Sequence, residues 1–304
     1  MNILLVLWTI AHFLTGAILG AVIGTALKRL LRDGGAVKQN YRQHEVINMM
    51  GLNFVLVWLV MMAMVAAFGF TQEILGFMVP EGFQLTPDLA MPLTILIAGV
   101  GIFGLIDDLL GSRESTGFRG HIGQLIKGRL TTGALKALGI PVVSFYAIYQ
   151  LSNGFAEAFG NSVLIALFVN TLNLLDLRPG RALKLFIPLL AIFLFYAPSS
   201  YALAVASLLG IAVVLVGADL REEIMLGDVG SNILGALLGF SFAVTFGWGI
   251  KLTLIVVMLV LQVLTEKYSL TQIIEKTPIL RTIDRMGRGK MDIPSARADS
   301  VPGE

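Results

Sequence analysis

The sequence predicts an all-α, polytopic integral membrane protein, a helical bundle with about nine transmembrane helices. Of its 304 residues, 56% are hydrophobic and only 14% are charged, whereas about a quarter of the residues are charged in soluble domains. Apolar runs of about 20 residues, long enough to cross a bilayer as helices, recur along the chain. Lysine and arginine are concentrated in alternate segments between these runs, as expected when those segments face the cytoplasm.

We expect spans at residues 3–27, 46–70, 89–108, 133–151, 155–176, 182–197, 199–217, 230–248 and 251–266. The first run lacks a basic leader and a small-residue cleavage site, so it is expected to remain as a helix. The sixth run is short and the fourth contains Pro141, which a membrane helix tolerates because neighbouring groups satisfy the freed backbone. Eight or ten spans remain alternatives. The absence of cysteine excludes disulfides and thiolate metal sites.

The basic residues also predict the orientation of the chain. With nine spans, 21 of the 22 Lys and Arg residues fall on one side, and only Lys251 falls on the other. We therefore expect the N-terminus outside and the C-terminus in the cytoplasm. Residues 1–266 would form the transmembrane domain, and 267–304 a cytoplasmic tail. The tail is expected to be amphipathic with a break near Pro278, and then disordered.

Two adjacent carboxylates, Asp107 and Asp108, end the apolar run LTILIAGVGIFGLIDDLL. Ionisable residues in a membrane segment are functional-site candidates, and negative charge at a helix C-terminus opposes the helix dipole. Adjacent carboxylates stay ionised together only in water or beside a cation. Mg²⁺ is the usual cation and commonly arrives with a substrate phosphate. The pair therefore indicates metal-assisted phosphate chemistry, with an ordinary solvated helix end as the alternative.

A second polar cluster lies at the inner end of the span 155–176. Asn170, Asn173 and Asp176 are spaced three residues apart, which places them roughly along one stripe of a helix. The amides would bind substrate, and the aspartate would reach a metal. Hydrogen bonding between helices is the alternative for the two asparagines.

A third cluster, GDVGSN at residues 227–232, opens the eighth span. A helix N-terminus favours anions, so Asp228 would hold a cation there while Ser231 faces a phosphate. Helix capping by these residues is the alternative, and the motif alone favours it.

Two inner loops add basic and polar residues that suit phosphate oxygens. In the loop RESTGFRGHIGQLIKGRLTT the candidates, set among four glycines, are Arg119, His121, Lys127 and Arg129. In the first inner loop they are Lys38, Asn40 and Arg42. For both loops, a plain topology signal is an equal alternative.

Three segments in order resemble those of a known family: IDDLLG at 106–111, NTLNLLD at 170–176 and GDVGSNILG at 227–235. They are similar to the polyprenyl-phosphate N-acetylhexosamine-1-phosphate transferases, glycosyltransferase family 4. That superfamily includes phospho-N-acetylmuramoyl-pentapeptide transferase and the UDP-GlcNAc:undecaprenyl-phosphate transferases. The resemblance extends over about residues 28–266.

The resemblance implies transfer of a sugar 1-phosphate from a nucleotide sugar, a UDP-N-acetylhexosamine, to a polyprenyl phosphate. Nucleoside monophosphate would be released, as in phosphotransferases of the EC 2.7.8 type. The cofactor would be Mg²⁺, with Mn²⁺ as an alternative. The setting would be cell envelope biogenesis at the cytoplasmic face of a bacterial plasma membrane. No nucleic-acid partner is expected, and a homodimer is one expected assembly.

Residue by residue, the resemblance assigns catalytic roles to Asp107, Asp108 and Asp176. It assigns metal ligation to Asp228, together with Asp176 and Asp108. Phosphoryl transfer needs charge neutralisation and positioning more than covalent help, and carboxylates that hold a metal supply both.

The chain departs from the family pattern at two places. The family commonly continues its third motif to a second aspartate, where this chain has Pro179, with Arg178 and Arg181 beside it. A late histidine-bearing loop is also missing, because no histidine follows His121. These departures leave a non-catalytic relative that binds lipid phosphate or a partner enzyme as the main alternative. A cation-coupled transporter is less favoured, since the polar clusters gather at one membrane face rather than at the midplane.

Overall fold

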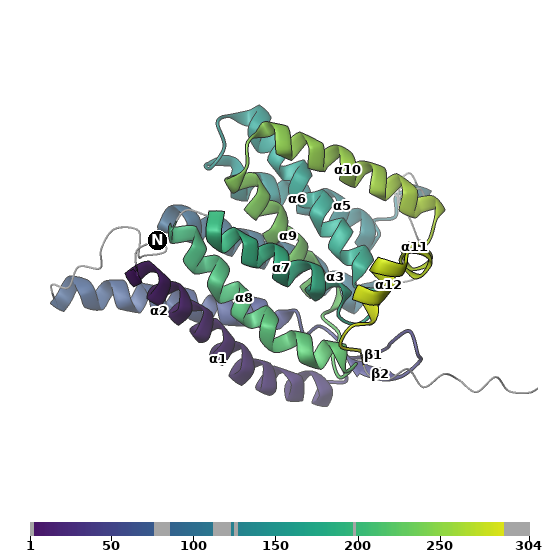
Figure 1. Ribbon diagram of the computed structural model, residues 1–304, viewed down its shortest axis with the longest axis horizontal. Helices are drawn as coiled ribbons and strands as arrows, with labels where there is room; N and C mark the ends of the chain where they lie inside the picture. The colour runs from purple at the N-terminus through teal and green to yellow at the C-terminus, as the bar shows by residue number, and fades with distance from the viewer. Residues whose placement is uncertain (1–2, 76–85, 112–122, 125–126, 197–198, 289–304) are drawn as a thin grey trace, which may run out of the picture.

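The computed structural model describes residues 3–75, 86–111, 123–124, 127–196 and 199–288 (Figure 1). Its described helices are α1 (Ile3–Asp33), α2 (Leu52–Leu75), α3 (Pro87–Leu110), α5 (Thr132–Tyr149), α6 (Phe155–Leu175), α7 (Arg181–Tyr196), α8 (Ser199–Leu220), α9 (Gly227–Thr245), α10 (Trp248–Lys267), α11 (Leu270–Lys276) and α12 (Pro278–Arg285). One antiparallel hairpin joins β1 (Val37–Gln39) to β2 (Glu45–Ile47).

The structure confirms the predicted helical class, and its long apolar helices agree with a multi-pass membrane protein. Within the described residues, seven are long and apolar enough to cross a membrane, namely α1, α3, α5, α6, α8, α9 and α10. A further apolar stretch, Leu52–Ala67, lies in α2. Helix α7 has 16 residues, which span about 24 Å and fall short of a hydrocarbon core about 30 Å thick.

The second predicted span begins too early, because residues 45–47 form a strand and the helix starts at Leu52. Val37 pairs with Ile47 across the hairpin, and Ile47 also bridges Ile224 in the loop between α8 and α9. That second contact joins residues far apart in the sequence, so no local pattern could indicate it. The apolar residues at the start of the run therefore belong to a strand anchored by tertiary contacts.

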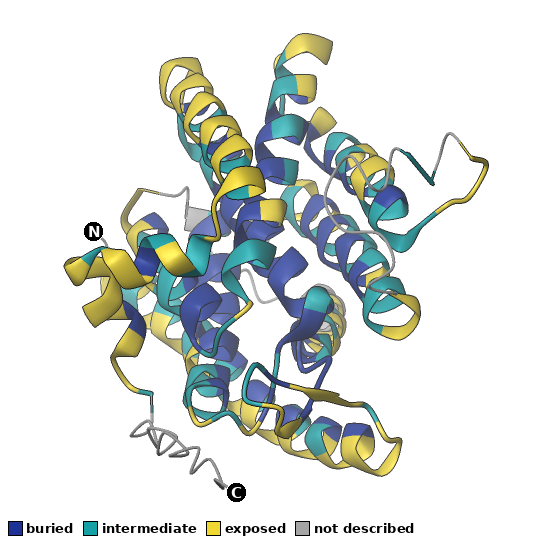
Figure 2. Ribbon diagram, turned by 90° about the vertical axis from the view of Figure 1, so that its right-hand side faces the viewer, coloured by how far each residue is buried: buried dark blue, intermediate teal, exposed yellow. Residues whose placement is uncertain are grey.

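Helix α9 forms the centre of the bundle. Fifteen of its 19 residues are buried, and it packs against α3, α6 and α7. Figure 2 shows this buried interior surrounded by helices whose outer faces are exposed. Few residues of α1 and α10 are buried, as expected of apolar helices that face lipid.

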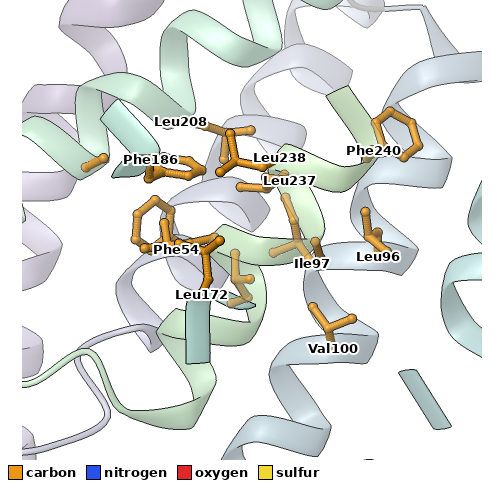
Figure 3. Packing of buried hydrophobic residues seen from close by; sticks show 14 of the residues in the cluster. Phe54, Leu96, Ile97, Val100, Leu172, Phe186, Leu208, Leu237, Leu238 and Phe240 are labelled. Carbon is orange, nitrogen blue, oxygen red and sulfur yellow. The ribbon is translucent and has the colours of Figure 1, made fainter. Parts of the chain in front are cut away.

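The core is built from large apolar side chains of several helices (Figure 3). Phe54 of α2 meets Phe186 of α7 edge to face, with ring centroids 6.3 Å apart. Leu172 of α6 and Leu237 of α9 are fully buried in the same cluster. Because lipid tails are as apolar as leucine, close packing rather than transfer from water holds membrane helices together.

Two glycines bring α9 against its neighbours, backbone to backbone. A Cβ on Gly104 of α3 would lie 2.5 Å from the carbonyl oxygen of Asp228. A Cβ on Gly51, just before α2, would lie 2.1 Å from the amide nitrogen of Gly230. No side chain fits at either point, so Gly104 lets the end of α3, and Gly51 the chain before α2, approach the start of α9 closely.

The chain after α10 returns to the bundle as two short helices, α11 and α12. They are separated at Thr277, where the sequence predicts a break before Pro278. The guanidinium of Arg181 binds both carboxylate oxygens of Asp284, at 2.7 and 3.0 Å, and both residues are buried. Figure 1 shows α11 and α12 at the same end of the bundle as the hairpin. The residues expected to be disordered, 292–304, lie outside the described part of the chain.

Candidate functional site

Three helix ends meet at one end of the bundle and bring two aspartates onto one lysine. Asp107 is on the last turn of α3, Lys136 on the first turns of α5, and Asp228 on the first turn of α9. The Lys136 ammonium forms an ion pair with Asp107 and lies 3.2 Å from an oxygen of Asp228. The three side chains are between 15% and 20% exposed. A single cation thus joins carboxylates that are 121 residues apart in the chain.

Asp108 faces inward and accepts hydrogen bonds at both of its carboxylate oxygens. Its side chain has no exposed surface, and it accepts hydrogen bonds from Asn48 Nδ2 at 2.9 Å and from the Val229 amide at 3.1 Å. The second bond satisfies a backbone N–H in the first turn of α9, which has no partner within its own helix. The Lys38 ammonium lies 3.9 Å from Asp108 Oδ1, the oxygen that also accepts from Asn48. Asp108 therefore joins α3, α9 and the hairpin.

The hairpin is held in place by the loop between α8 and α9. The Met225 amide donates to the carbonyl oxygen of Ile47 at 2.7 Å. Glu222 of the same loop accepts from Asn40 Nδ2 at 2.8 Å and from the Tyr41 hydroxyl at 3.1 Å. The hairpin is thereby fixed over the aspartates.

These segments enclose a cleft of about 400 Å³, a size typical of small-molecule sites. It is lined by Lys38, Gln39, Asn40, Tyr41, Gln43, Asn48, Asp108, Asn173, Asp176, Leu177, Met225, Gly227 and Asp228. Six of these are sequence-predicted candidates: Lys38, Asn40, Asp108, Asn173, Asp176 and Asp228. Residues from the first inner loop and from all three motif segments thus share one cleft.

Six other candidates are described but do not line the cleft, namely Asp107, which pairs with Lys136, Asn170, Arg42, Ser231, Lys127 and Arg129. Arg42 lies 3.4 Å from Glu222 and braces the hairpin. Ser231 is fully buried, and its hydroxyl donates to Asn173 Oδ1 at 3.2 Å, so it orients that amide. Lys127 and Arg129 are exposed before α5. Arg119 and His121 lie outside the described residues.

Asn170 is exposed and does not line the cleft, unlike Asn173 and Asp176. Three residues turn an α-helix by about 300°, so each step along the predicted stripe falls about 60° short of a full turn. Two steps separate Asn170 from Asp176 by about 120°. The predicted common stripe is therefore too skewed for all three side chains to face one cleft.

Sequence reasoning missed two residues that organise the site, Lys136 and Asn48. Lys136 carried a signal, because a lysine within a predicted membrane span is a functional candidate by default. Asn48 carried none, since its role depends on a strand that the sequence did not indicate. Its Oδ1 is buried and has no hydrogen-bond partner among the described residues.

Acidic side chains outnumber basic ones in the lining of the cleft, and this affects the pKa of Asp176. Burial raises the pKa of Asp176 well above its ordinary value, and the nearby carboxylates of Asp219, Asp228 and Asp108 raise it further. Among the thirteen lining residues, three are aspartates and one is a lysine. An anionic ligand would therefore need additional positive charge in order to enter.

The oxygen atoms that line the cleft suit a hard divalent cation as ligands. Carboxylate and amide oxygens are the ligands that Mg²⁺ accepts, and Asn48 Oδ1 is a buried acceptor without a donor. Within the described parts of the chain, no three Asp, Glu, His or Cys side chains are close enough to hold a metal by themselves. Mg²⁺ commonly binds through one or two carboxylates plus water and substrate phosphates. The site therefore fits a metal that arrives with a phosphate ligand.

Replacing Asp176 by asparagine should stabilise the metal-free protein at neutral pH. A carboxyl whose pKa is raised in the folded state contributes stability below its unfolded pKa of about 4, and this contribution is lost as pH rises through the folded pKa. The melting temperature of Asp176→Asn should exceed that of the wild type by at least about 2 °C at pH 8, and the difference should vanish near pH 4. Thermal unfolding in detergent and chelator measures this.

The control for that experiment is Asp33→Asn, because Asp33 is exposed at the end of α1. It should leave the melting temperature unchanged at both pH values. A stabilisation of Asp176→Asn that is equally large at pH 4 and pH 8 would contradict the electrostatic explanation.

We compared the chain with protein-family models and with curated proteins, and neither comparison gave a match.

Proposed function

We propose that the protein is an integral-membrane transferase that moves a sugar 1-phosphate from a nucleotide sugar to a polyprenyl phosphate. The observation that carries the proposal is the convergence of the three motif segments on one cleft: Asp108 from α3, Asp176 after α6 and Asp228 from α9. Resemblance in sequence order alone would not require these residues to meet. Their meeting at one end of an apolar helical bundle supports chemistry at a membrane surface.

In this reaction the acceptor phosphate attacks the sugar-linked phosphorus of the donor diphosphate. A new phosphoanhydride bond forms between lipid and sugar phosphates, the old one breaks, and the nucleoside monophosphate departs with the released oxygen. A phosphate monoester is mostly doubly ionised at neutral pH, because its second pKa is about 6. The attacking group therefore already carries its negative charge, and the protein has chiefly to position and neutralise charge.

The chain's own cations would supply part of that neutralisation. Lys38 lines the cleft, and Lys136 stands between Asp107 and Asp228. Asp107 would hold Lys136 in place, while Asp108 would fix the start of α9 through the Val229 amide. Ser231 would orient Asn173 toward the ligand.

Mg²⁺, or alternatively Mn²⁺, would be held by Asp228 and Asp176 together with water and the substrate phosphates, and it would neutralise the donor diphosphate when bound. Lys136 would remain paired with Asp107 and so keep that carboxylate compensated. The nucleotide sugar, the polyprenyl phosphate, the cytoplasmic orientation and a bacterial plasma membrane all belong to this proposal.

The direct test is turnover by the purified full chain with Mg²⁺, undecaprenyl phosphate and a panel of nucleotide sugars. Release of nucleoside monophosphate that requires both lipid and metal is the expected result. The panel should include several bases and sugars, because Pro179 stands where the family commonly has an aspartate. No release with any donor, from protein that still binds lipid phosphate, would contradict catalysis.

A second candidate function is a non-catalytic phosphate-binding protein of the membrane. It is favoured by Lys136, whose ammonium compensates Asp107 and Asp228 without any metal. This candidate predicts phosphate binding that is insensitive to chelator. The transferase predicts binding of nucleoside diphosphate that is lost when Mg²⁺ is removed.

A further inference from the structure

The loop after Asp176, residues 177–181, is held rigidly from three sides. The Gly180 amide donates to the buried carboxylate of Asp219 at 2.8 Å, and Gly180 has a positive φ of 75° that favours glycine. The carbonyl oxygen of Pro179 accepts from Arg288 Nε at 3.1 Å. Arg181 is buried against Asp284. These contacts hold the backbone of the loop, which also carries a second basic side chain, Arg178.

The side chain of Arg178 is fixed by an aromatic ring. Its guanidinium carbon lies 3.9 Å from the centroid of the Tyr41 ring, and the Tyr41 hydroxyl is held by Glu222. Stacking of this kind occupies the flat face of the guanidinium and leaves its edge N–H groups available. Among the residues that the structure describes, the guanidinium of Arg178 has no hydrogen-bond or ion-pair partner, whereas those of Arg181 and Arg288 both bind Asp284.

Arg178 borders the site already described. It lines a small recess with Tyr41, Asp176 and Asp219, and this recess shares Tyr41 and Asp176 with the main cleft. A half-buried guanidinium with free N–H groups, held still beside a ligand cleft, is suited to a planar or tetrahedral oxyanion.

We infer that Arg178 is a specificity-determining residue that binds a phosphate oxyanion at the rim of the cleft, with Tyr41 as its stacking platform. The source of the phosphate rests on the proposed function, as it is either the diphosphate of a nucleotide donor or the phosphate of a lipid acceptor. The binding itself does not depend on turnover.

Binding of two phosphate probes to the detergent-purified full chain in Mg²⁺ tests this inference by calorimetry. The probes are uridine diphosphate and a short-chain, water-soluble polyprenyl monophosphate. Arg178→Gln should weaken binding of one probe by about 10- to 100-fold, as expected for the loss of hydrogen bonds to a charged group. The probe that is affected identifies the phosphate source.

Two further variants separate the role of the stacked guanidinium from that of charge alone. Arg178→Lys keeps the charge and should recover only part of the affinity, because an ammonium lacks the planar fork. Tyr41→Leu removes the platform and should weaken the same probe several-fold. The matched control is Arg281→Gln on the exposed side of α12, which should bind as the wild type does.

Wild-type affinity of Arg178→Gln for both probes would overturn the inference. So would equal losses in Arg178→Gln and Arg281→Gln, or failure of the wild type to bind either probe. Absence of turnover with an intact Arg178-dependent affinity would refute the transferase and leave the inference standing. Circular dichroism and size-exclusion chromatography establish that each variant is folded.

Discussion

Asp228→Asn is expected to abolish turnover while the protein stays folded. Asp228 lines the cleft, is partly exposed, and shares Lys136 with Asp107. Asparagine has nearly the same shape but lacks the charge needed to hold Lys136 and a divalent cation. Because the proposed sugar-phosphate transfer would depend on preorganised charge, the loss should reach at least about 10²- to 10³-fold. The measurement is the rate of nucleoside monophosphate release at saturating donor and acceptor.

Asp33→Asn serves as the matched control, since it makes the same chemical change at an exposed position outside the cleft. Its turnover should equal that of the wild type. Substantial activity in Asp228→Asn would remove the basis for a charged metal site at the start of α9. Unchanged size-exclusion and circular dichroism profiles would show that any loss arises in the cleft.

Asp108→Asn is a less selective test than Asp228→Asn. Asp108 accepts from Asn48 Nδ2 and from the Val229 amide in a fully buried position. An asparagine there would direct its own N–H groups toward at least one of these donors, which leaves a buried group unsatisfied. Activity loss in that variant would therefore combine chemistry with a displaced α9.

Lys136→Met should have the largest effect on stability. The substitution leaves Asp107 and Asp228 close together without their shared cation. Breaking a largely buried ion pair by removing one partner typically destabilises a protein by about 3–5 kcal/mol. For a chain of this size, such a loss corresponds to a fall in melting temperature of at least about 6 °C. Thermal unfolding in detergent with chelator would measure it.

Mg²⁺ should then raise the melting temperature of Lys136→Met more than that of the wild type. A cation that binds the folded state between the two carboxylates stabilises it by mass action, and the variant has more uncompensated charge for it to neutralise. Lys127→Met, at an exposed position before α5, is the control and should unfold as the wild type does. If both lysine variants melt alike, Lys136 does not hold the aspartates together.

The helical, multi-pass class of the protein and its candidate aspartates were predictable because the bilayer imposes simple rules on a sequence. A helix must be apolar for about 20 residues to cross the hydrocarbon core, so the seven candidate spans appear as apolar runs. Charged groups are unfavourable near such runs and are kept where they have a role. Asp107, Asp108, Asp176 and Asp228 stood out for this reason, and three of them line the cleft.

The hairpin and its residues could not be predicted in the same way. Val37 pairs with Ile47 only because the loop between α8 and α9 supplies the next bridge at Ile224. This contact joins segments almost 180 residues apart, and the apolar pattern around Val46 fits a helix equally well. Asn48 directly follows β2, so its hydrogen bond to Asp108 also depends on a segment that the sequence predicted as helix.

The sequence by itself determined a polytopic helical protein with conspicuous acidic groups near its helix ends, because hydropathy and charge placement depend on the membrane and not on the neighbours. Only the tertiary structure decided which of these groups meet. Gly104 and Gly51 let α9 approach its neighbours closely enough for Asp228 and Asp107 to share Lys136. The packing also decided which side of α6 lines the cleft, and therefore that Asn173 and Asp176 face it. A contact between helices depends on their distance and rotation, which no local periodicity encodes.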